Sequence, residues 1–342
     1  MGLPSGVRRV AASQPFARLV DLLERIVPAR PDTLAVLTFH RVTPDRPGVV
    51  PGLLSATPDG FAALLDAVAR RHRIVGIDDV LGRARGGRRL RRRSVLLTVD
   101  DAYADFAEHA WPALRARGLP VVLFVPTAYP DAPDRAFWWE RLFGAIRATS
   151  RSTIDGPDGS LPLTTDAERE AAYRRLRGML KAMPHEELVR CVDDLVAALG
   201  GGAPAATEGA QTGAAGSAAA ADGRVLGWDE LRRLRSEGVS LAPHTRTHPL
   251  LSRLPGDASE AEIAGSREDL LRMTGSELPV FAYPSGATSP EAADAARRAG
   301  IEVAFTTERG VNNLRSADWL GLRRINVSVR TPSALVRAQM LR

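Results

Sequence analysis

The chain has 342 residues, of which 44% are hydrophobic and 25% charged, a composition ordinary for a globular protein. No stretch reaches the roughly 18 uninterrupted apolar residues of a membrane-spanning helix, and the first residues lack the apolar run of a secretory signal. The single cysteine, Cys191, excludes a disulfide within the chain and a cysteine-based metal cluster. These features favour a cytoplasmic protein whose length allows one large core or two smaller ones.

The net charge of +6 comes almost wholly from arginine, because Lys181 is the only lysine among 46 basic residues. Such a bias is more typical of a GC-rich coding sequence than of a binding face. Seven arginines crowd into residues 81–94, which we interpret as a solvated loop. No aromatic residues alternate with them, so we expect no nucleic-acid partner. A weak contact with an anionic surface through Arg83–Arg93 is the alternative.

Short apolar runs alternate with longer amphipathic ones along the chain. An amphipathic helix is expected at 13–27. The strands predicted after it span 33–39, 73–77, 94–99, 119–125, 239–242, 280–283, 301–307 and 323–329. The predicted helices span 58–72, 103–118, 228–238, 259–275 and 289–300, with one more at the C-terminus. Strands that alternate with helices pair in parallel, which predicts an α/β fold, either a doubly wound sheet or a (β/α) barrel.

Residues 130–226 interrupt this alternation and are predicted to form a helical insertion. Within them, residues 200–224 are rich in Gly, Ala, Ser and Thr, and we expect a disordered loop there. The expected organisation is therefore an N-terminal helical extension (1–32), a central domain (33–330) that contains the insertion, and a C-terminal helix (331–342).

Polar residues follow four of the predicted strands at their C-terminal ends. They are His40, the pair Asp100 and Asp101, the pair His244 and His248, and the segment 283–286. The carboxyl ends of parallel strands are where α/β folds assemble their active sites. We therefore expect these side chains to share one site.

His244 and His248 have a spacing that suits two ligands of one metal ion, although Pro243 and Pro249 favour a turn over a long helix. Two histidines and one carboxylate form a common zinc site. One of the two aspartates would complete that site, and the other would take a proton from the attacking water. Capping of the following helix is an alternative that needs only one aspartate.

Two further residues near this site have a less specific sequence signal. Asp105 is interpreted as part of the first turn of helix 103–118. His40 ends a strand that points to the expected site, and a general-acid role is one interpretation. A structural histidine that is hydrogen-bonded at the strand end is the other.

Three motifs resemble those of the polysaccharide deacetylases with NodB homology, also called carbohydrate esterase family four. They are TVDDAY (98–103), HTRTHP (244–249) and FAYPSG (281–286). Further segments resemble one branch of that family: TFHRV (38–42), FWWE (137–140), WDEL (228–231) and EIAGSR (262–267).

The resemblance implies a distorted (β/α) barrel of the NodB-homology type and a metal-dependent N-deacetylase, usually with Zn2+. It assigns the general base to Asp100 and the metal to Asp101, His244 and His248. It further implies that the backbone N–H of Ser285 contributes to an oxyanion hole, and that substrate is contacted by Tyr283, Pro284 and Trp139.

The sequence also departs from the family pattern. Val99 and Ala102 replace the usual Phe and Gly of the first motif, and Ala282 stands where many members have an arginine that orients the base. A late Leu-x-His motif is missing, since the matching segment, LRRINV (322–327), has no histidine. In related poly-N-acetylglucosamine deacetylases a histidine at the position of His40 takes the acid role.

The sequence thus predicts a metal-dependent hydrolase that removes N-acetyl groups from a polysaccharide or a glycan precursor. The alternatives are a hydrolase of another non-peptide amide, such as a cyclic imide or a peptidoglycan amide, and a non-catalytic glycan-binding protein on the same fold.

Overall fold

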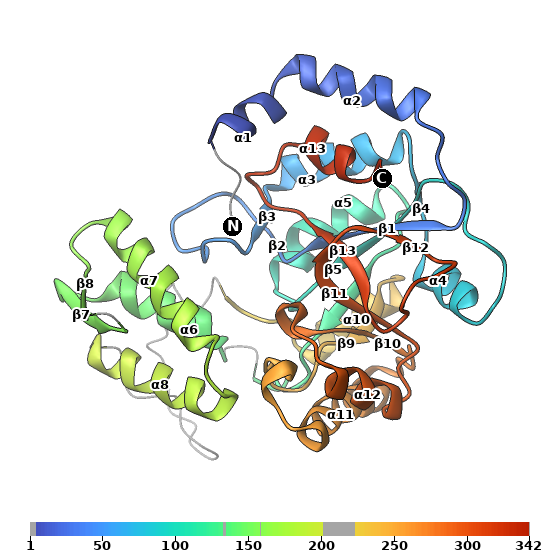
Figure 1. Cartoon of the computed structure of the whole chain (residues 1–342). Helices are drawn as coiled ribbons and strands as arrows, with labels where there is room; N and C mark the ends of the chain where they lie inside the picture. Colours follow the sequence, from blue (N-terminus) through green and yellow to red (C-terminus); the bar gives the residue numbers. More distant parts are fainter. Residues whose placement is uncertain (1–4, 133–134, 158, 201–222, 342) are drawn as a thin grey trace.

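The computed structural model describes residues 5–132, 135–157, 159–200 and 223–341. Seven strands pair in parallel in the order β10–β11–β13–β1–β5–β6–β9 (Figure 1). Their bounds are β1 Thr33–Phe39, β5 Ser94–Val99, β6 Val122–Val125, β9 Ser240–Pro243, β10 Val280–Ala282, β11 Val303–Arg309 and β13 Leu322–Asn326.

The two ends of this path, β9 and β10, lie side by side, but no ladder of hydrogen bonds joins them in the described part of the chain. Instead, the Ser276 hydroxyl donates to the carbonyl of Leu241 at 2.7 Å across the seam. The sheet is therefore a nearly closed parallel barrel, and the predicted distorted (β/α) barrel is confirmed.

Successive residues of the barrel strands point alternately into the barrel and out to the helices. Leu34 and Leu96 belong to an inner apolar cluster in which Phe124 of β6 and Phe305 of β11 meet, with ring centroids 5.8 Å apart. Leu97 belongs to the cluster formed with the outer helices. Because both faces are buried, these strands are almost continuous apolar runs, which is why the sequence pattern identifies them.

Helices and short strands complete the barrel domain. The helices are α3 Pro58–Ala69, α4 Ile77–Ala84, α5 Trp111–Arg115, α10 Trp228–Ser236, α11 Gly256–Thr274 and α12 Pro290–Arg298, with the short turns η2 Leu251–Arg253 and η3 Pro284–Gly286. The short strands are β2 Arg41–Val42, β3 Leu54–Ala56, β4 Arg73–Ile74 and β12 Val311–Asn313. In the described residues, no helix is long and apolar enough to cross a membrane.

A lobe beside the barrel contains α6 Trp138–Ala148, the hairpin β7 Thr153–Gly156 and β8 Gly159–Pro162, α7 Asp166–Leu180 and α8 His185–Ala198 (green in Figure 1). Its helices bury Leu142, Ile146, Leu176 and Val192 against one another. Most of the segment predicted to be disordered, residues 201–222, lies outside the described residues.

At the top of Figure 1, α1 Ser5–Ala11 and α2 Gln14–Ile26 lie over α13 Ser333–Gln339. The buried Arg337 of α13 forms ion pairs with Asp21 and Glu24 of α2. Both ends of the described chain therefore meet on one side of the barrel.

The helix predicted for 103–118 begins later than expected, and its first turn is not α-helical. Five residues, Phe106–Ala110, form one π-helical turn (η1), and α5 begins only at Trp111. Asp105 precedes the helix and is buried, where it accepts hydrogen bonds from Arg41 Nε at 2.7 Å and from the Val42 backbone N–H at 3.2 Å. The carboxylate anchors β2 to this turn instead of occupying an exposed first helical turn.

Candidate metal centre and active site

Asp100 and Asp101 both reach one cavity because the backbone turns sharply after β5. Leu96 points into the barrel, so strand alternation directs Asp100 inward as well and would direct Asp101 outward. Asp101 and Ala102, however, adopt left-handed backbone conformations with φ of 72° and 51°. This conformation costs a residue other than glycine about 1–2 kcal/mol. The strained conformation of these two residues therefore places the carboxylates of Asp100 and Asp101 in the same cavity.

The other loops of the site are strained in the same way. Thr245, His248 and Ser285 have φ angles of 67°, 60° and 55°. In the described part of the chain, seven residues other than glycine have a positive φ, and five of them lie in these three loops. Such clustering is typical of sites where function, and not stability, determines the backbone.

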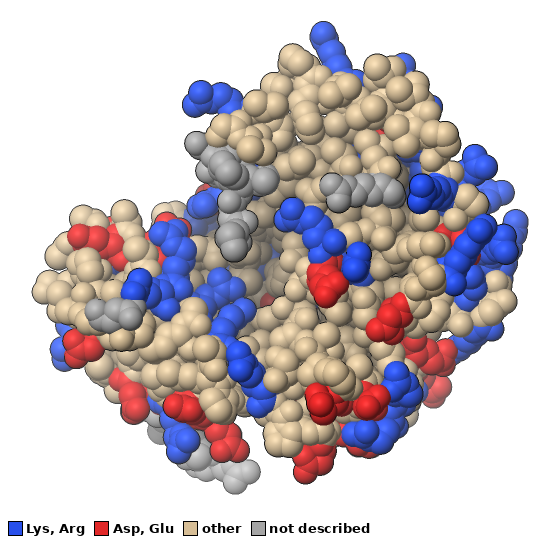
Figure 2. All heavy atoms as spheres, viewed as in Figure 1, with Lys and Arg blue, Asp and Glu red and all other residues tan. Residues whose placement is uncertain are grey.

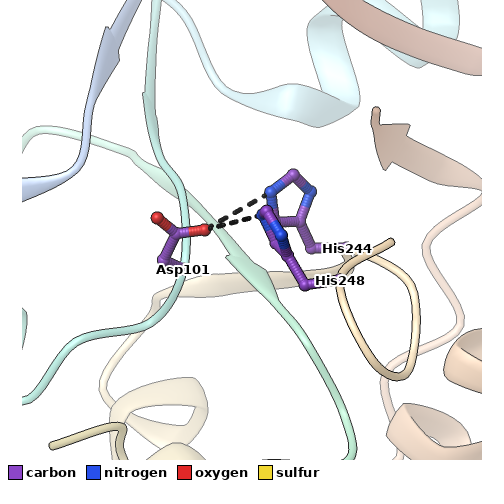
Figure 3. Close-up of side chains that lie close together, drawn as sticks. All are labelled: Asp101, His244 and His248. Carbon is purple, nitrogen blue, oxygen red and sulfur yellow. Dashed lines mark ion pairs between the residues drawn. The ribbon is translucent and has the colours of Figure 1, made fainter. Parts of the chain in front are cut away.

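Asp101, His244 and His248 form a buried group of three potential metal ligands (Figure 3). Asp101 Oδ1 lies 3.5 Å from His244 Nε2 and 3.3 Å from His248 Nε2. A tetrahedral zinc ion with bonds of about 2.0–2.1 Å separates its ligand atoms by about 3.3 Å. Asp101 Oδ1 is also buried and has no hydrogen-bond partner in the described residues. The three side chains therefore fit a divalent cation held between them.

The surroundings of the two imidazoles favour metal binding. His244 Nδ1 lies 2.7 Å from the carbonyl oxygen of Ala282, which can only accept, so Nδ1 carries the proton and Nε2 presents its lone pair towards Asp101. His248 packs against the ring of Trp139, with centroids 4.8 Å apart. Burial lowers the pKa of His248 despite the nearby Asp101 carboxylate, which favours the neutral imidazole that binds metals.

Asp100 is held by a buried arginine. The Nη1 and Nη2 groups of Arg324 each donate to one Asp100 carboxylate oxygen at 2.8 Å, and Nε donates to the Thr306 carbonyl at 2.7 Å. Burial alone would raise the pKa of Asp100, but the charge of Arg324, with the nearby His244 and His40, outweighs it and lowers the pKa. Asp100 is therefore an ionised and oriented carboxylate.

Arg324 was not among the site residues predicted from the sequence. The resemblance points to position 282 for an arginine beside the base, and Ala282 cannot supply a guanidinium. Arg324 comes from β13, the strand in which the late histidine motif is absent. Its one sequence signal is strand alternation, which places Arg324 on the inward face with Leu322, where a charged residue is unexpected.

His40 lies in the same site. Its Nε2 is 4.0 Å from Asp100 Oδ2, and its backbone N–H donates to the Ser55 hydroxyl at 2.8 Å. The side chain is 25% exposed and lines the cavity. The structure therefore brings together His40, Asp100 and the three potential ligands from distant parts of the sequence.

The cavity has a volume of about 200 Å³. Besides the residues just described, the predicted residues Trp139 and Ser285 line it. Tyr283 and Pro284, expected to contact substrate, do not. Tyr283 is fully buried, with its ring packed 5.2 Å from that of Phe281 in an apolar cluster next to α12.

One face of α7, continued by the residue directly after it, forms a wall of the cavity that was not predicted from the sequence. Tyr173, Arg177 and Lys181 recur at intervals of four residues and all line the cavity. The Tyr173 hydroxyl is buried without a hydrogen-bond partner in the described residues. Lys181 donates to the Ser285 hydroxyl at 3.0 Å and so links the lobe to η3.

The cationic groups of this wall are poorly compensated. Neither Arg177 nor Lys181 forms an ion pair with a carboxylate within the described chain. Burial, together with the charge of Arg177, lowers the pKa of Lys181 to about 8. The wall therefore presents hydrogen-bond donors and positive charge to whatever enters the cavity.

Comparison with known proteins agrees with this geometry. Residues 205–304 match the family model described as "Polysaccharide deacetylase", a segment that includes His244, His248 and the motif at 281–286. "Putative polysaccharide deacetylase YxkH" of Bacillus subtilis (strain 168) is 27% identical over 100 residues, which are 29% of this chain and 36% of that protein. The match thus spans about a third of the length of this curated relative.

Solved structures match over a much larger part of the chain. The Streptococcus pyogenes deacetylase PplD, solved with acetate, has a TM-score of 0.59 at 18% identity, over 91% of this chain and 99% of that chain. IcaB from Ammonifex degensii has a TM-score of 0.56 at 18% identity, over 91% and 98%. At this identity, the likeness shows the shared fold. The family-model match and the curated relative add a sequence similarity to polysaccharide deacetylases over about 100 residues.

Proposed function

We propose that the protein is a zinc-dependent N-deacetylase of an N-acetylated glycan. The observation that carries this proposal is the placement of a buried Asp101–His244–His248 group beside a separate ionised carboxylate, Asp100, in one cavity. The match of residues 205–304 to the polysaccharide deacetylase family model and the fold shared with solved deacetylases support the same chemistry.

The three potential ligands would hold the metal, and their nitrogen and oxygen donors suit zinc. When bound, a zinc ion polarises the acetyl carbonyl and lowers the pKa of water to about 7. Asp101 is available for this role because Arg324 binds Asp100 and not Asp101.

Asp100 acts as the general base. Ionised and fixed by Arg324, it takes a proton from the attacking water while the oxygen forms a bond to the acetyl carbon. The backbone N–H of Ser285 would stabilise the negative charge on the former carbonyl oxygen. His40, whose Nε2 lies 4.0 Å from Asp100 Oδ2, donates a proton to the sugar nitrogen as the C–N bond breaks, and acetate and a free amine result.

The cavity also constrains the substrate. Its volume of about 200 Å³ lies below the roughly 300 Å³ of pockets that enclose drug-sized ligands. One acetylated sugar would enter, and the rest of the glycan would remain outside. The donors of Tyr173, Arg177 and Lys181 favour a glycan that carries a negative charge near the acetamido group, since an anion would compensate both cations.

Two alternatives use the same fold. A hydrolase of another non-peptide amide would use the same residues and differ only in the substrate. A non-catalytic glycan-binding protein would need no ionised base, and the pairing of Asp100 with Arg324 next to the metal ligands therefore favours an enzyme.

Acetate release from neutral and uronate-containing N-acetylglucosamine oligosaccharides, with zinc added, tests the function. We expect wild type to release acetate. Asp100→Asn should lose about 10²–10⁴-fold in turnover and retain the metal, because it keeps the ligands and loses the base. His244→Ala should lose the metal as well, measured by elemental analysis. Wild-type protein that binds no zinc, or an Asp100→Asn variant as active as wild type, would refute the mechanism. Release only from other amides would favour the first alternative.

Replacement of His40 tests the general acid. His40→Ala should lower turnover of an active substrate about 10²–10⁴-fold and leave the zinc content unchanged. The control is His109→Ala, a partly exposed histidine outside the cavity, which should retain activity. Equal turnover of the His40 variant and wild type would rule out the acid role.

Removal of the guanidinium beside Asp100 should shift the pH dependence of kcat/KM. The pKa of Asp100 is lowered in the folded protein, so activity falls as the pH drops through that pKa. Arg324→Gln removes the stabilising charge, raises the pKa and should move the acid limb to higher pH. Arg324→Lys, which keeps the charge, should shift it less.

The matched control is Arg323→Gln on the same strand, an exposed residue paired with Glu308, which should leave the profile in place. Circular dichroism checks that each variant is folded, because an unpaired buried Asp100 costs about 3–5 kcal/mol. An unmoved acid limb in a folded Arg324→Gln variant would contradict this positioning role.

A further inference from the structure

Helix α2 is amphipathic, but it buries the carboxylate of Glu24 and exposes three large apolar side chains to solvent. Val20 and Glu24 are buried against the protein. Leu19, Leu22 and Ile26 lie on the opposite side of the helix and are exposed. A helix that merely covers a globular core has the reverse arrangement.

Arg337 of α13 is the partner of the carboxylates of α2. Its buried guanidinium binds both carboxylates of α2, the fully buried Glu24 and the half-exposed Asp21, and so engages both of them on the side of the helix that faces α13. Stable folding of α2 against α13 therefore leaves its apolar residues exposed.

The exposed apolar residues form one patch with those of α1. The described residues include seven exposed large hydrophobic side chains, and five lie on these two helices, 46–62% exposed. We call this patch, with the exposed Arg18 and Arg25 beside it, the outer face of α1–α2. It consists of Val7, Val10, Arg18, Leu19, Leu22, Arg25 and Ile26.

Positive charge lies beside this face, and the one partly exposed carboxylate near it, Asp21, is already paired with Arg337. No carboxylate in the described chain pairs directly with Arg18 or Arg25. In Figure 2, the upper end of the molecule, where α1 and α2 lie in Figure 1, is tan and blue with almost no red. Red and blue spheres are mixed over the lower part of the same view.

The arginine-rich segment adds to this charge. Arg93 donates to the Val27 carbonyl at 3.1 Å, so the segment lies against the C-terminal end of α2. Arg83 and Arg85 are neutralised by Asp32 and Glu302, and the anionic-surface contact considered for Arg83–Arg93 therefore cannot use the whole segment. Within residues 83–93, all of which the structure describes, the exposed arginines without an ion pair are Arg88, Arg89, Arg91 and Arg92.

We propose that the outer face of α1–α2 binds the surface of an anionic lipid bilayer, with α2 parallel to the membrane plane. The apolar stripe would enter the boundary between headgroups and acyl chains, and Arg18 and Arg25 would remain at the anionic headgroups. The arginines beside the C-terminal end of α2 would reach the same surface. This binding is independent of the proposed catalytic function.

The charge and composition of this face favour a lipid bilayer over two other binding partners, a second copy of the chain and a nucleic acid. A second copy of the chain, packed by two-fold symmetry through this face, would bring the arginines of the two copies together without compensating carboxylates. A nucleic acid would compensate the arginines but would leave the aliphatic stripe unused, since the face has no aromatic residue on which bases stack.

Flotation of the full chain with vesicles tests the proposal. We expect binding to vesicles of phosphatidylcholine with 30% phosphatidylglycerol, little binding to pure phosphatidylcholine, and weaker binding at high salt. The double variant Leu22→Gln with Ile26→Gln should reduce binding at least about tenfold. The matched control, Leu271→Gln with Val329→Gln, changes the two exposed aliphatic residues elsewhere in the described chain and should bind like wild type.

A second double variant, Arg18→Gln with Arg25→Gln, changes only exposed side chains and should weaken binding to anionic vesicles while the fold is retained. Absence of wild-type binding, or equal binding by both double variants and wild type, would overturn the proposal. A wild-type dimer that ignores vesicles and becomes a monomer in the Leu22/Ile26 variant would also overturn it and assign the face to self-association.

Discussion

The site depends on the bidentate pair between Arg324 and Asp100, which makes two neighbouring carboxylates chemically different. Both aspartates are buried in the same cavity, and two like charges so close would otherwise raise each other's pKa. Arg324 satisfies both oxygens of Asp100, whereas Asp101 Oδ1 has no hydrogen-bond partner in the described residues. One carboxylate is thereby fixed as a base, and the other is left for a cation. The inside of the barrel supplies the remaining acceptor that a buried guanidinium needs, the carbonyl of Thr306.

The strands of the barrel bring the side chains of the site to one rim, and the loops after these strands determine the directions in which the side chains point. Parallel strands bring His40, Asp100 and His244 to one rim, although more than 200 residues separate the first from the last. Regular strand geometry would then turn Asp101 away, and the left-handed residues correct this direction. His244 also binds the carbonyl of Ala282 across the seam where β9 and β10 do not pair. The ligand is thus oriented by the same contact that bridges the gap in the barrel.

Much of this could be predicted from the sequence, because buried strands and doubled polar motifs leave local patterns. The strand at 33–39 matches β1, and the residues Asp101, His244 and His248 do converge. Contacts between distant segments left no such pattern. Arg324, the α7 wall and the buried pair of Asp105 with Arg41 all depend on partners far away in the chain. Tyr283 was assigned to substrate by its motif, yet its ring packs into the apolar core.

The rarity of lysine has a practical consequence. Lys181 is the only lysine of the chain, and its amine lies in the wall of the cavity next to Ser285. Its pKa of about 8 leaves a far larger fraction of unprotonated amine at neutral pH than an ordinary lysine has. Apart from the α-amino group, an amine-selective acylating reagent therefore has one target on this chain. The rate of that single modification becomes a direct optical or mass-spectrometric reporter of cavity occupancy, with no engineered label.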